Sequence, residues 1–331
     1  MADLQLSIVL SDNDRTRPIL DGAVRPDGIE LVSTTLHPSE MFWRQLRFAE
    51  FDVSEMSLSS LLIALAHGDT RWTALPIFTS RQFFHTGIWI RTDRGIDSPA
   101  DLRGKRVGVP EYQQTAALWA RAALEHEFGV RPTEIEWHME RTEDMSHGGA
   151  TGFTPPIGVV VKRIPADKSI GSMLLAGELD ATLLYLTNVN LVDRSRARLE
   201  GDPRFRLLFP DPVAEGARYY RKTGFFPINH GMVVRRSILE RHPWVALNLF
   251  NAFMAAKESV ITRTRELLDP FVRLGMLPPE AREAVASDPF AYGARTNRPI
   301  LEAITQYSHE QGLTPRVLSL EEIFAPSTLD L

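Results

Sequence analysis

The sequence predicts a two-domain α/β protein with a ligand cleft between the domains. The chain has 331 residues, more than one hydrophobic core usually organises, so we expect two domains of about 100 to 200 residues each. Short β-branched runs alternate with amphipathic helical stretches. The clearest unit is residues 106–130, where a strand at Val107–Val109 leads through a polar loop into a helix closed by Gly129.

The polar loop of that unit, Glu111–Thr115, is a candidate anion site. It lies over the first turn of the helix, where four backbone N–H groups lack partners and the helix dipole is positive. Glu111, Gln114 and Thr115 are therefore candidate substrate-binding residues. The alternative is an ordinary strand-to-helix connection with Thr115 as the N-cap.

The composition favours a small-molecule partner. The net charge is −5, with acidic and basic residues mixed along the chain, so the sequence shows neither a basic nucleic-acid footprint nor a polybasic membrane segment. The cysteine count is zero, which excludes disulfides, cysteine metal sites and thiol nucleophiles.

The N-terminal residues indicate a strand rather than a targeting segment. Leu4–Leu10 follows Asp3 without a positively charged region, and the chain turns polar again at Ser11. No apolar run reaches the roughly 18 residues that a membrane span needs. We therefore expect a cytoplasmic protein.

The first predicted domain begins with two strands and two helices. The strands are Leu4–Leu10 and Ile29–Thr35, and the helices are Ser39–Glu50, with Ser39 as N-cap, and Ser57–Ala66, which follows a short strand at residues 51–57. Arg15 and Arg17 follow the first strand, at the end that faces the ligand crevice in α/β proteins. They either meet a substrate carboxylate or belong to a solvated turn.

The passage toward the second domain carries Arg81 and His85. Residues 79–85 follow an apolar run, and Gly87–Arg91 alternates as a strand. Because residues an even number apart share one face of a strand, Arg81 and His85 are expected to point the same way. Residues 92–104 are predicted to connect the domains.

The second predicted domain ends with a return crossing. Residues 141–165 are Gly/Pro-rich and without period, which is typical of a functional or mobile loop near a cleft or a subunit contact. The elements that follow are a helix at Ser169–Ala176, a turn and strand at Gly177–Tyr185, an arginine-bearing helix, a strand at Phe205–Phe209, the return crossing at 223–235, and helices at Trp244–Thr262 and Leu301–Gln311. The predicted domains are 1–104 plus 226–331, and 105–225.

This order of elements resembles the type II periplasmic-binding-protein fold, with mixed sheets flanked by helices. Three stretches are more specific: residues 97–124 (DSPADLRGKRVGVPEYQQTAALWARAAL), 177–185 (GELDATLLY) and 225–246 (FFPINHGMVVRRSILERHPWVA). Together with His85, they resemble the cytoplasmic 4,5-dihydroxyphthalate decarboxylases. The thiamin-pyrimidine synthases share the fold but use a Cys-rich iron motif, which this chain cannot form.

The resemblance implies a decarboxylase of a dihydroxylated aromatic carboxylate that uses neither metal nor cofactor. Such chemistry needs arginines and a helix N-terminus to hold carboxylates, and a histidine to protonate the ring carbon. His85 and His230 are the catalytic candidates because both fall on the predicted crossing strands. The candidate substrate-binding residues are Arg15, Arg17, Arg81, Glu111, Gln114, Thr115, Asp180 and Tyr185. A structural role for Glu111 and Asp180 is the alternative.

Two other functions remain open from the sequence. A solute-binding protein that delivers a small carboxylate to a transporter would have the same hinge and cleft without chemistry. A cytoplasmic ligand-sensing module is the third possibility, although no DNA-binding segment is visible. A homo-oligomer is compatible with the sequence.

Overall fold

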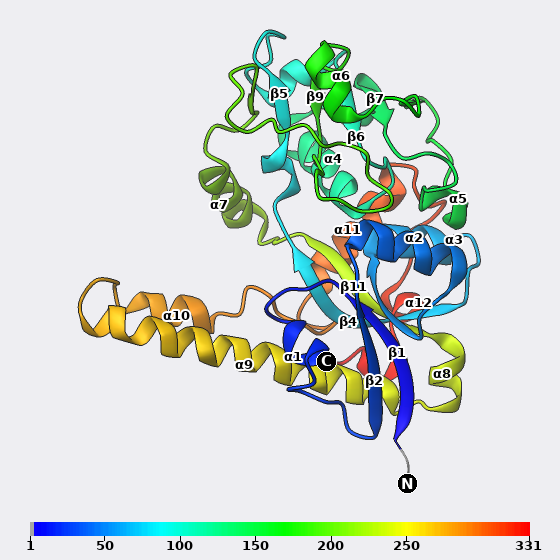
Figure 1. The fold of residues 1–331 in the computed structure, drawn as a ribbon, viewed down its shortest axis with the longest axis vertical. Helices are drawn as coiled ribbons and strands as arrows, with labels where there is room; N and C mark the ends of the chain where they lie inside the picture. Colours follow the sequence, from blue (N-terminus) through cyan, green and yellow to red (C-terminus); the bar gives the residue numbers. More distant parts are fainter. Residues whose placement is uncertain (1–2) are drawn as a thin grey trace.

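The chain folds around two mixed β-sheets that lie one above the other in Figure 1. The structure is a computed structural model, and it describes residues 3–331. The first sheet occupies the lower half of the view and the second sheet the upper half, with helices against both. The predicted two-sheet α/β architecture is confirmed.

The first sheet has five strands in the order β2-β1-β3-β11-β4. Their bounds are β1 (Leu4–Leu10), β2 (Ile29–Thr35), β3 (Val53–Ser57), β4 (Trp72–Arg81) and β11 (Ile228–Arg235). β1 is parallel to β2 and β3, whereas β11 runs antiparallel to β3 and β4. β11 comes from the return crossing and places His230 directly opposite Ser57 of β3.

The second sheet has six strands in the order β10-β5-β9-β6-β7-β8. Their bounds are β5 (Trp89–Arg91), β6 (Arg106–Val109), β7 (Glu136–Met139), β8 (Val160–Arg163), β9 (Ala181–Thr182) and β10 (Phe205–Leu207). Because β5 already belongs to this sheet, the chain leaves the first sheet between Arg81 and Trp89, earlier than the predicted connector at 92–104. The division into domains at residues 104 and 226 stays a prediction.

The helices flank both sheets. Their bounds are α1 (Arg17–Leu20), α2 (Pro38–Phe48), α3 (Leu58–Ala66), α4 (Thr115–Phe128), α5 (Gly148–Thr151), α6 (Ile170–Ala176), α7 (Pro212–Thr223), α8 (Arg236–Arg241), α9 (Val245–Arg273), α10 (Glu280–Ala286), α11 (Arg298–Glu310) and α12 (Leu320–Ile323). Short 3-10 turns are η1 (Phe84–Gly87), η2 (Pro99–Leu102), η3 (Pro132–Glu134) and η4 (Pro326–Thr328). Within residues 3–331, no helix combines the length and the apolar character that a bilayer crossing requires.

The apolar core is continuous between the two sheets. One buried cluster contains strand residues of both sheets together with residues of α3, α4, α9 and α11. The Trp119 indole of α4 donates a hydrogen bond to the Ile228 carbonyl of β11 at 2.8 Å, and α11 packs on both α4 and α3. The two sheets are therefore held by shared packing as well as by the crossing segments.

Several element boundaries differ from the predictions. His37, not Ser39, is the N-cap of α2, because Pro38 takes the first helical position and the His37 ring accepts the Ser39 N–H. The helix predicted to begin at Trp244 continues to Arg273, and its far end projects with α10 at the left of Figure 1.

Other differences concern whole elements. The arginine-bearing helix expected before Phe205 is wrong: residues 190–204 form loop and turns. The segment 141–165, expected to be a loop, contains the short elements α5 and β8, while α7 was not predicted. Part of that segment is buried, including Arg141, Ser146 and His147.

Candidate functional site

A cavity of about 190 Å³ lies where the helices of the two sheets meet. The residues that line it come from the segments around both sheets. They are His37, Pro38, Ser39, Phe42, Ser57, Gln82, Phe84, Gln114, Thr115, Ala116, Arg141, His147, Leu184, Leu186, Asn229 and His230. It is smaller than the roughly 300–1,000 Å³ of sites for drug-sized ligands, so it matches a ligand with one ring. Leu184 has φ 56°, in the left-handed region that residues other than glycine seldom adopt.

Three helix N-termini line this cavity, those of α2, α3 and α4. The hydroxyls of Ser57 and Thr115 lie 2.9 Å apart, and Thr115 Oγ1 also accepts the Ser59 N–H at 2.9 Å, which joins the first turns of α3 and α4. α4 has no side-chain cap, and the buried Gln114 amide nitrogen has no partner within residues 3–331. The combined dipoles and free donors make this end of the cavity suited to an anion.

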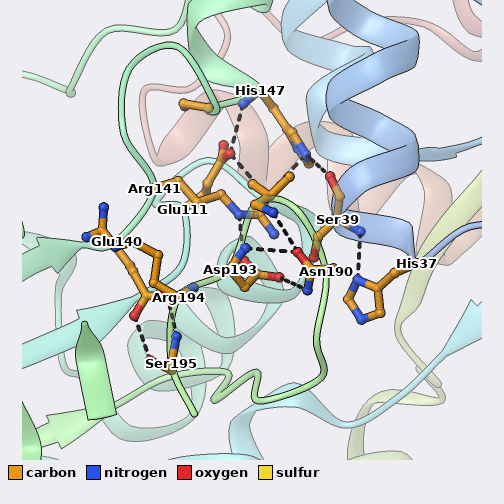
Figure 2. Close-up of polar contacts among 12 residues, drawn as sticks. His37, Ser39, Glu111, Glu140, Arg141, His147, Asn190, Asp193, Arg194 and Ser195 are labelled. Carbon is orange, nitrogen blue, oxygen red and sulfur yellow. Dashed lines mark hydrogen bonds and ion pairs between the residues drawn. The ribbon is translucent and has the colours of Figure 1, made fainter. Parts of the chain in front are cut away.

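The second cationic feature is Arg141, which Figure 2 shows among its partners. Its Nη1 donates to Glu111 Oε1 at 3.1 Å and its Nε donates to Asp193 Oδ1 at 2.8 Å. All three side chains are at most 2% exposed. Burial alone would lower the pKa of Arg141, but the Asp193 and Glu111 carboxylates raise it above its ordinary value, so the guanidinium stays charged. Arg141 therefore brings a charged guanidinium to the cavity wall, within a cluster that carries a net formal charge of −1 with its two carboxylates.

His147 attaches the same cluster to α2. The Glu111 carboxylate accepts the His147 backbone N–H at 2.8 Å, and Arg141 Nη1 lies 3.1 Å from His147 Nε2. His147 Nε2 also lies 3.3 Å from the Ser39 carbonyl. An arginine can only donate to Nε2, whereas a carbonyl can only accept from it, so these contacts are satisfied by opposite tautomers of the neutral ring. Burial lowers the pKa of His147.

His230 also lines the cavity and has a carboxylate behind it. Its Nδ1 is 3.0 Å from Glu55 Oε1, and its Nε2 is 2.8 Å from the Asn229 amide nitrogen. Phe42 holds the ring edge-on, with centroids 4.7 Å apart. The Asn229 amide can only donate to Nε2, so the neutral ring carries its proton on Nδ1 and offers Nε2 as a base. A carboxylate on the far nitrogen stabilises the imidazolium that forms when Nε2 takes up a proton.

His37 offers the complementary tautomer. Its Nδ1 accepts the Ser39 N–H at 3.3 Å, so the proton of the neutral ring lies on Nε2. Burial lowers the pKa of His37, which keeps the ring neutral near pH 7. The cavity therefore holds one imidazole that can carry a proton and one that can donate a hydrogen bond.

Of the predicted site residues, His230, Gln114 and Thr115 line the cavity, and Glu111 lies behind Arg141. The remaining ones lie outside the cavity lining. Among residues 3–331, no three His, Asp or Glu side chains are grouped so that they could hold a metal ion. The absence of a metal from the reaction stays a prediction.

The predicted position of His85 is wrong. His85 lies in the 3-10 turn η1 rather than on a strand, so it does not share a face with Arg81. Its Nε2 is 3.1 Å from Glu215 Oε1 of α7, and its ring is packed by Tyr219 and Phe209.

The arginines of the first sheet have structural partners. Arg81 donates to the Phe226 and Ala291 carbonyls and to Asn297, and burial lowers its pKa to about 10. Arg15 donates to the Thr79 carbonyl at 2.8 Å, whereas Arg17 pairs with an aspartate at the surface. Contacts within the protein therefore account for the placement of all three arginine side chains, and no ligand is needed to explain it.

Asp180 and Tyr185 also have structural contacts. Asp180 accepts from Arg106 on the second sheet, with Arg94 at 3.4 Å. The Tyr185 hydroxyl donates to the Ala197 carbonyl at 2.7 Å, and burial raises its pKa to about 12. Both residues therefore stabilise the second sheet and its loop.

Five residues of the cavity and its polar surroundings were not predicted from the sequence: His37, Glu55, Arg141, His147 and Asp193. Arg141 and His147 lie in the long Gly/Pro-rich segment, where no periodicity assigns a position. Glu55 did carry a signal: it is a carboxylate in the middle of an otherwise apolar and serine-rich strand, which indicates a buried charge with partners.

We expect His85→Asn to leave turnover within about threefold of the wild type, because His85 does not touch the cavity. Its loss should instead lower the melting temperature, since a buried side chain with a hydrogen bond to Glu215 is removed. Steady-state kinetics and thermal unfolding of the same preparation check both points. A drop in kcat beyond about a hundredfold would restore the catalytic role predicted from the sequence.

The free energy of unfolding should fall as the pH drops below 6.5. Burial lowers the pKa of His37, His85 and His147 below the ordinary histidine value of about 6.5. Between the folded and unfolded pKa values the unfolded chain binds more protons, so the stability rises with pH and is lost on acidification. Melting temperatures measured from about pH 8 to about pH 5.5 test this. A flat profile over that range would show that these rings protonate without cost.

Comparisons with known proteins give one family and one fold. No protein-family model matches the chain. A protein of Comamonas testosteroni is 36% identical over 333 residues, covering 100% of this chain and 99% of its own length. A protein of Pseudomonas putida is 37% identical over 228 residues, covering 68% of this chain and 84% of its own length. Both relatives are named 4,5-dihydroxyphthalate decarboxylase.

Solved structures confirm the periplasmic-binding-protein fold. The alkanesulfonate-binding protein SsuA of Xanthomonas axonopodis pv. citri aligns with a TM-score of 0.57 at 14% identity, covering 98% of this chain and 99% of its own. The aliphatic sulphonate binding protein SsuA of Escherichia coli aligns with a TM-score of 0.55 at 14% identity, covering 100% and 95%. The desulfurization enzyme DSZB has a TM-score of 0.50 at 17% identity, covering 98% and 97%.

Proposed function

Because the chain belongs to the 4,5-dihydroxyphthalate decarboxylase family, we propose that it is a carboxy-lyase that converts 4,5-dihydroxyphthalate, or a close dihydroxylated relative, into 3,4-dihydroxybenzoate and CO2. The full-length similarity to the Comamonas testosteroni protein carries this proposal. The reaction would belong to phthalate degradation. The proposed active site is the cavity between the two sheets.

The carboxylate that remains on the ring would bind at the positive end of the cavity. The first turn of α4 offers free backbone N–H groups, and the Arg141 guanidinium, whose charge is balanced by Glu111 and Asp193, adds the N–H donors of Nη2. Arg141 Nη2 makes no hydrogen bond within residues 3–331, while Nε and Nη1 are held by Asp193 and Glu111. Glu111 thus supports the arginine rather than contacting the substrate.

His230 would supply the proton that replaces the departing carboxylate on the ring carbon. In the imidazolium form, Nε2–H protonates the ring carbon that bears the carboxylate. The bond from this carbon to the carboxylate then breaks, its electron pair restores the aromatic ring, and CO2 leaves. Solvent returns the proton to Nε2, so each turnover consumes one proton and releases one CO2.

His37 would orient the other end of the ring. Its Nε2–H can donate to a hydroxyl oxygen of the ring, which would fix the orientation of the ring in the cavity. The apolar side chains of Phe42, Phe84 and Leu184 line the cavity beside these polar groups and exclude water from the ring.

The alternative, a solute-binding protein without chemistry, has weaker support. The SsuA proteins share the fold at 14% identity, which gives no information on the ligand. The cytoplasmic location and a homo-oligomeric state stay predictions.

The test is CO2 release from purified, EDTA-treated protein supplied with 4,5-dihydroxyphthalate, with calorimetry on the same compound. We expect one CO2 and one 3,4-dihydroxybenzoate for each substrate consumed. Binding without CO2 would identify a solute-binding protein instead. Neither binding nor turnover would show that the ligand is a different compound.

A further inference from the structure

Glu55 is a fully buried carboxylate that receives four hydrogen-bond contacts from neighbouring strands and the loop after β1. Ser11 approaches Oε2 through its backbone N–H and its hydroxyl, each at 2.6 Å. Thr79 Oγ1 donates to Oε1 at 2.6 Å, and His230 Nδ1 lies 3.0 Å from the same oxygen. Both carboxylate oxygens are therefore occupied by donors, and the carboxylate contacts no arginine or lysine within residues 3–331.

These donors keep Glu55 ionised. Burial would raise the pKa of Glu55, but the hydrogen bonds from His230, Ser11 and Thr79 lower it below its ordinary value. An ionised carboxylate only accepts, so His230 must direct Nδ1–H toward Glu55. The Nε2 lone pair is then turned toward Asn229 and the cavity.

We propose that Glu55 is a positioning residue, which holds the proton of the neutral His230 ring on Nδ1 and orients the ring so that the Nε2 lone pair faces the substrate and can take up the proton to be transferred. The effect of Glu55 on turnover rests on the proposed function, because it acts only through His230. The effect on the tautomer does not, and it can be measured on the protein without substrate.

The substitution Glu55→Gln should invert the tautomer. The Ser11 backbone N–H is an obligatory donor, so the glutamine oxygen must stay at the position of Oε2. The amide nitrogen then takes the position of Oε1, beside His230 Nδ1. Because this nitrogen can only donate, the His230 proton moves to Nε2 and the lone pair turns away from the cavity.

Asp52 supplies a control for Glu55, because it makes the same kind of contact between the β3 segment and the β1 segment. Asp52 Oδ2 accepts the Ser7 backbone N–H at 3.0 Å and the Ser7 hydroxyl at 2.9 Å, as Glu55 Oε2 does with Ser11. Asp52 lies before β3, at the opposite end of that strand from Ser57, and within residues 3–331 it has no histidine partner. Asp52 is partly exposed and also lies 3.5 Å from Arg235, so Asp52→Asn removes a carboxylate with the same serine contacts without touching His230.

The experiment measures the ring nitrogen chemical shifts of histidine-labelled protein, with the His230 signals identified by their loss in His230→Asn. The wild type and Asp52→Asn should show Nδ1–H, whereas Glu55→Gln should show Nε2–H. The kcat of Glu55→Gln should fall about 10³- to 10⁴-fold, since a wrong tautomer in a carboxylate–histidine pair costs about that much. KM should change only a few-fold, and Glu55→Asp should recover part of kcat.

Three results would overturn the proposal. The first is an Nε2–H tautomer in the wild type, an observation that does not depend on whether any variant folds. The second is an unchanged tautomer in Glu55→Gln. The third is a loss of kcat in Glu55→Gln no larger than in Asp52→Asn. If the wild type releases no CO2 but the tautomer switches as expected, the decarboxylase proposal fails while the positioning role of Glu55 stands.

Discussion

Replacing His230 with asparagine is expected to lower kcat by about 10²- to 10⁴-fold, the range that a positioned proton carrier contributes. Asparagine keeps an amide N–H near the position of Nδ1, so the contact with Glu55 can persist. Only the group corresponding to Nε2 is lost from the cavity. The folded structure and the carboxylate site on α4 should therefore survive.

The measurement is a comparison of turnover with binding. Calorimetry should give a Kd for 4,5-dihydroxyphthalate within about tenfold of the wild type, a difference of about 1.4 kcal/mol. His85→Asn is the matched control, because it removes a buried histidine that does not line the cavity. Unchanged turnover in His230→Asn would remove this residue from the mechanism.

Replacing Arg141 with methionine is expected to lower the free energy of unfolding by about 3–5 kcal/mol, because two buried carboxylates lose their cation. Glu111 and Asp193 are at most 1% exposed, so water cannot replace the guanidinium. Burial would raise the pKa of Asp193, but Arg141 holds it below its ordinary value. Without Arg141 this carboxyl should bind a proton in the folded state, so the deficit relative to wild type should shrink as the pH falls.

Denaturant unfolding at about pH 8 and about pH 5.5 checks this result. Arg141→Lys keeps the charge, but a single ammonium group cannot reproduce the separate contacts of Nε with Asp193 and of Nη1 with Glu111. It should therefore cost less stability and mainly raise KM. The triple change Arg141→Met, Glu111→Gln and Asp193→Asn removes all the charges and should recover part of the loss. A loss below about 1 kcal/mol in Arg141→Met would show that the cluster contributes no more than a surface ion pair.

The sequence predicts the parts of the site that depend on local pattern. The strand–loop–helix unit at 106–130 places Gln114 and Thr115 at the first turn of α4, and both line the cavity. The extended run at 223–235 places His230 on β11 for the same reason. In each case the local pattern fixes the approximate bounds of the element, and the position of the residue follows from those bounds.

The remaining site residues depend on tertiary contacts that periodicity does not encode. His85 was expected on a crossing strand, but the chain turns into η1 there and α7, which was not predicted, covers it. Arg141 reaches Glu111 and Asp193 across separations of 30 and 52 residues. No local pattern in a Gly/Pro-rich segment specifies such pairings.

In the proposed mechanism the substrate binds and reacts in the cavity between the two sheets. A crystal structure of the His230→Asn variant with 4,5-dihydroxyphthalate tests it most directly, because that variant should bind the substrate without consuming it. We predict one ring in the cavity, with one carboxylate at the first turn of α4 and Arg141, and the carbon of the second carboxylate facing residue 230. A ring bound at Arg15, Arg81 or His85, or anywhere else outside this cavity, would contradict the account.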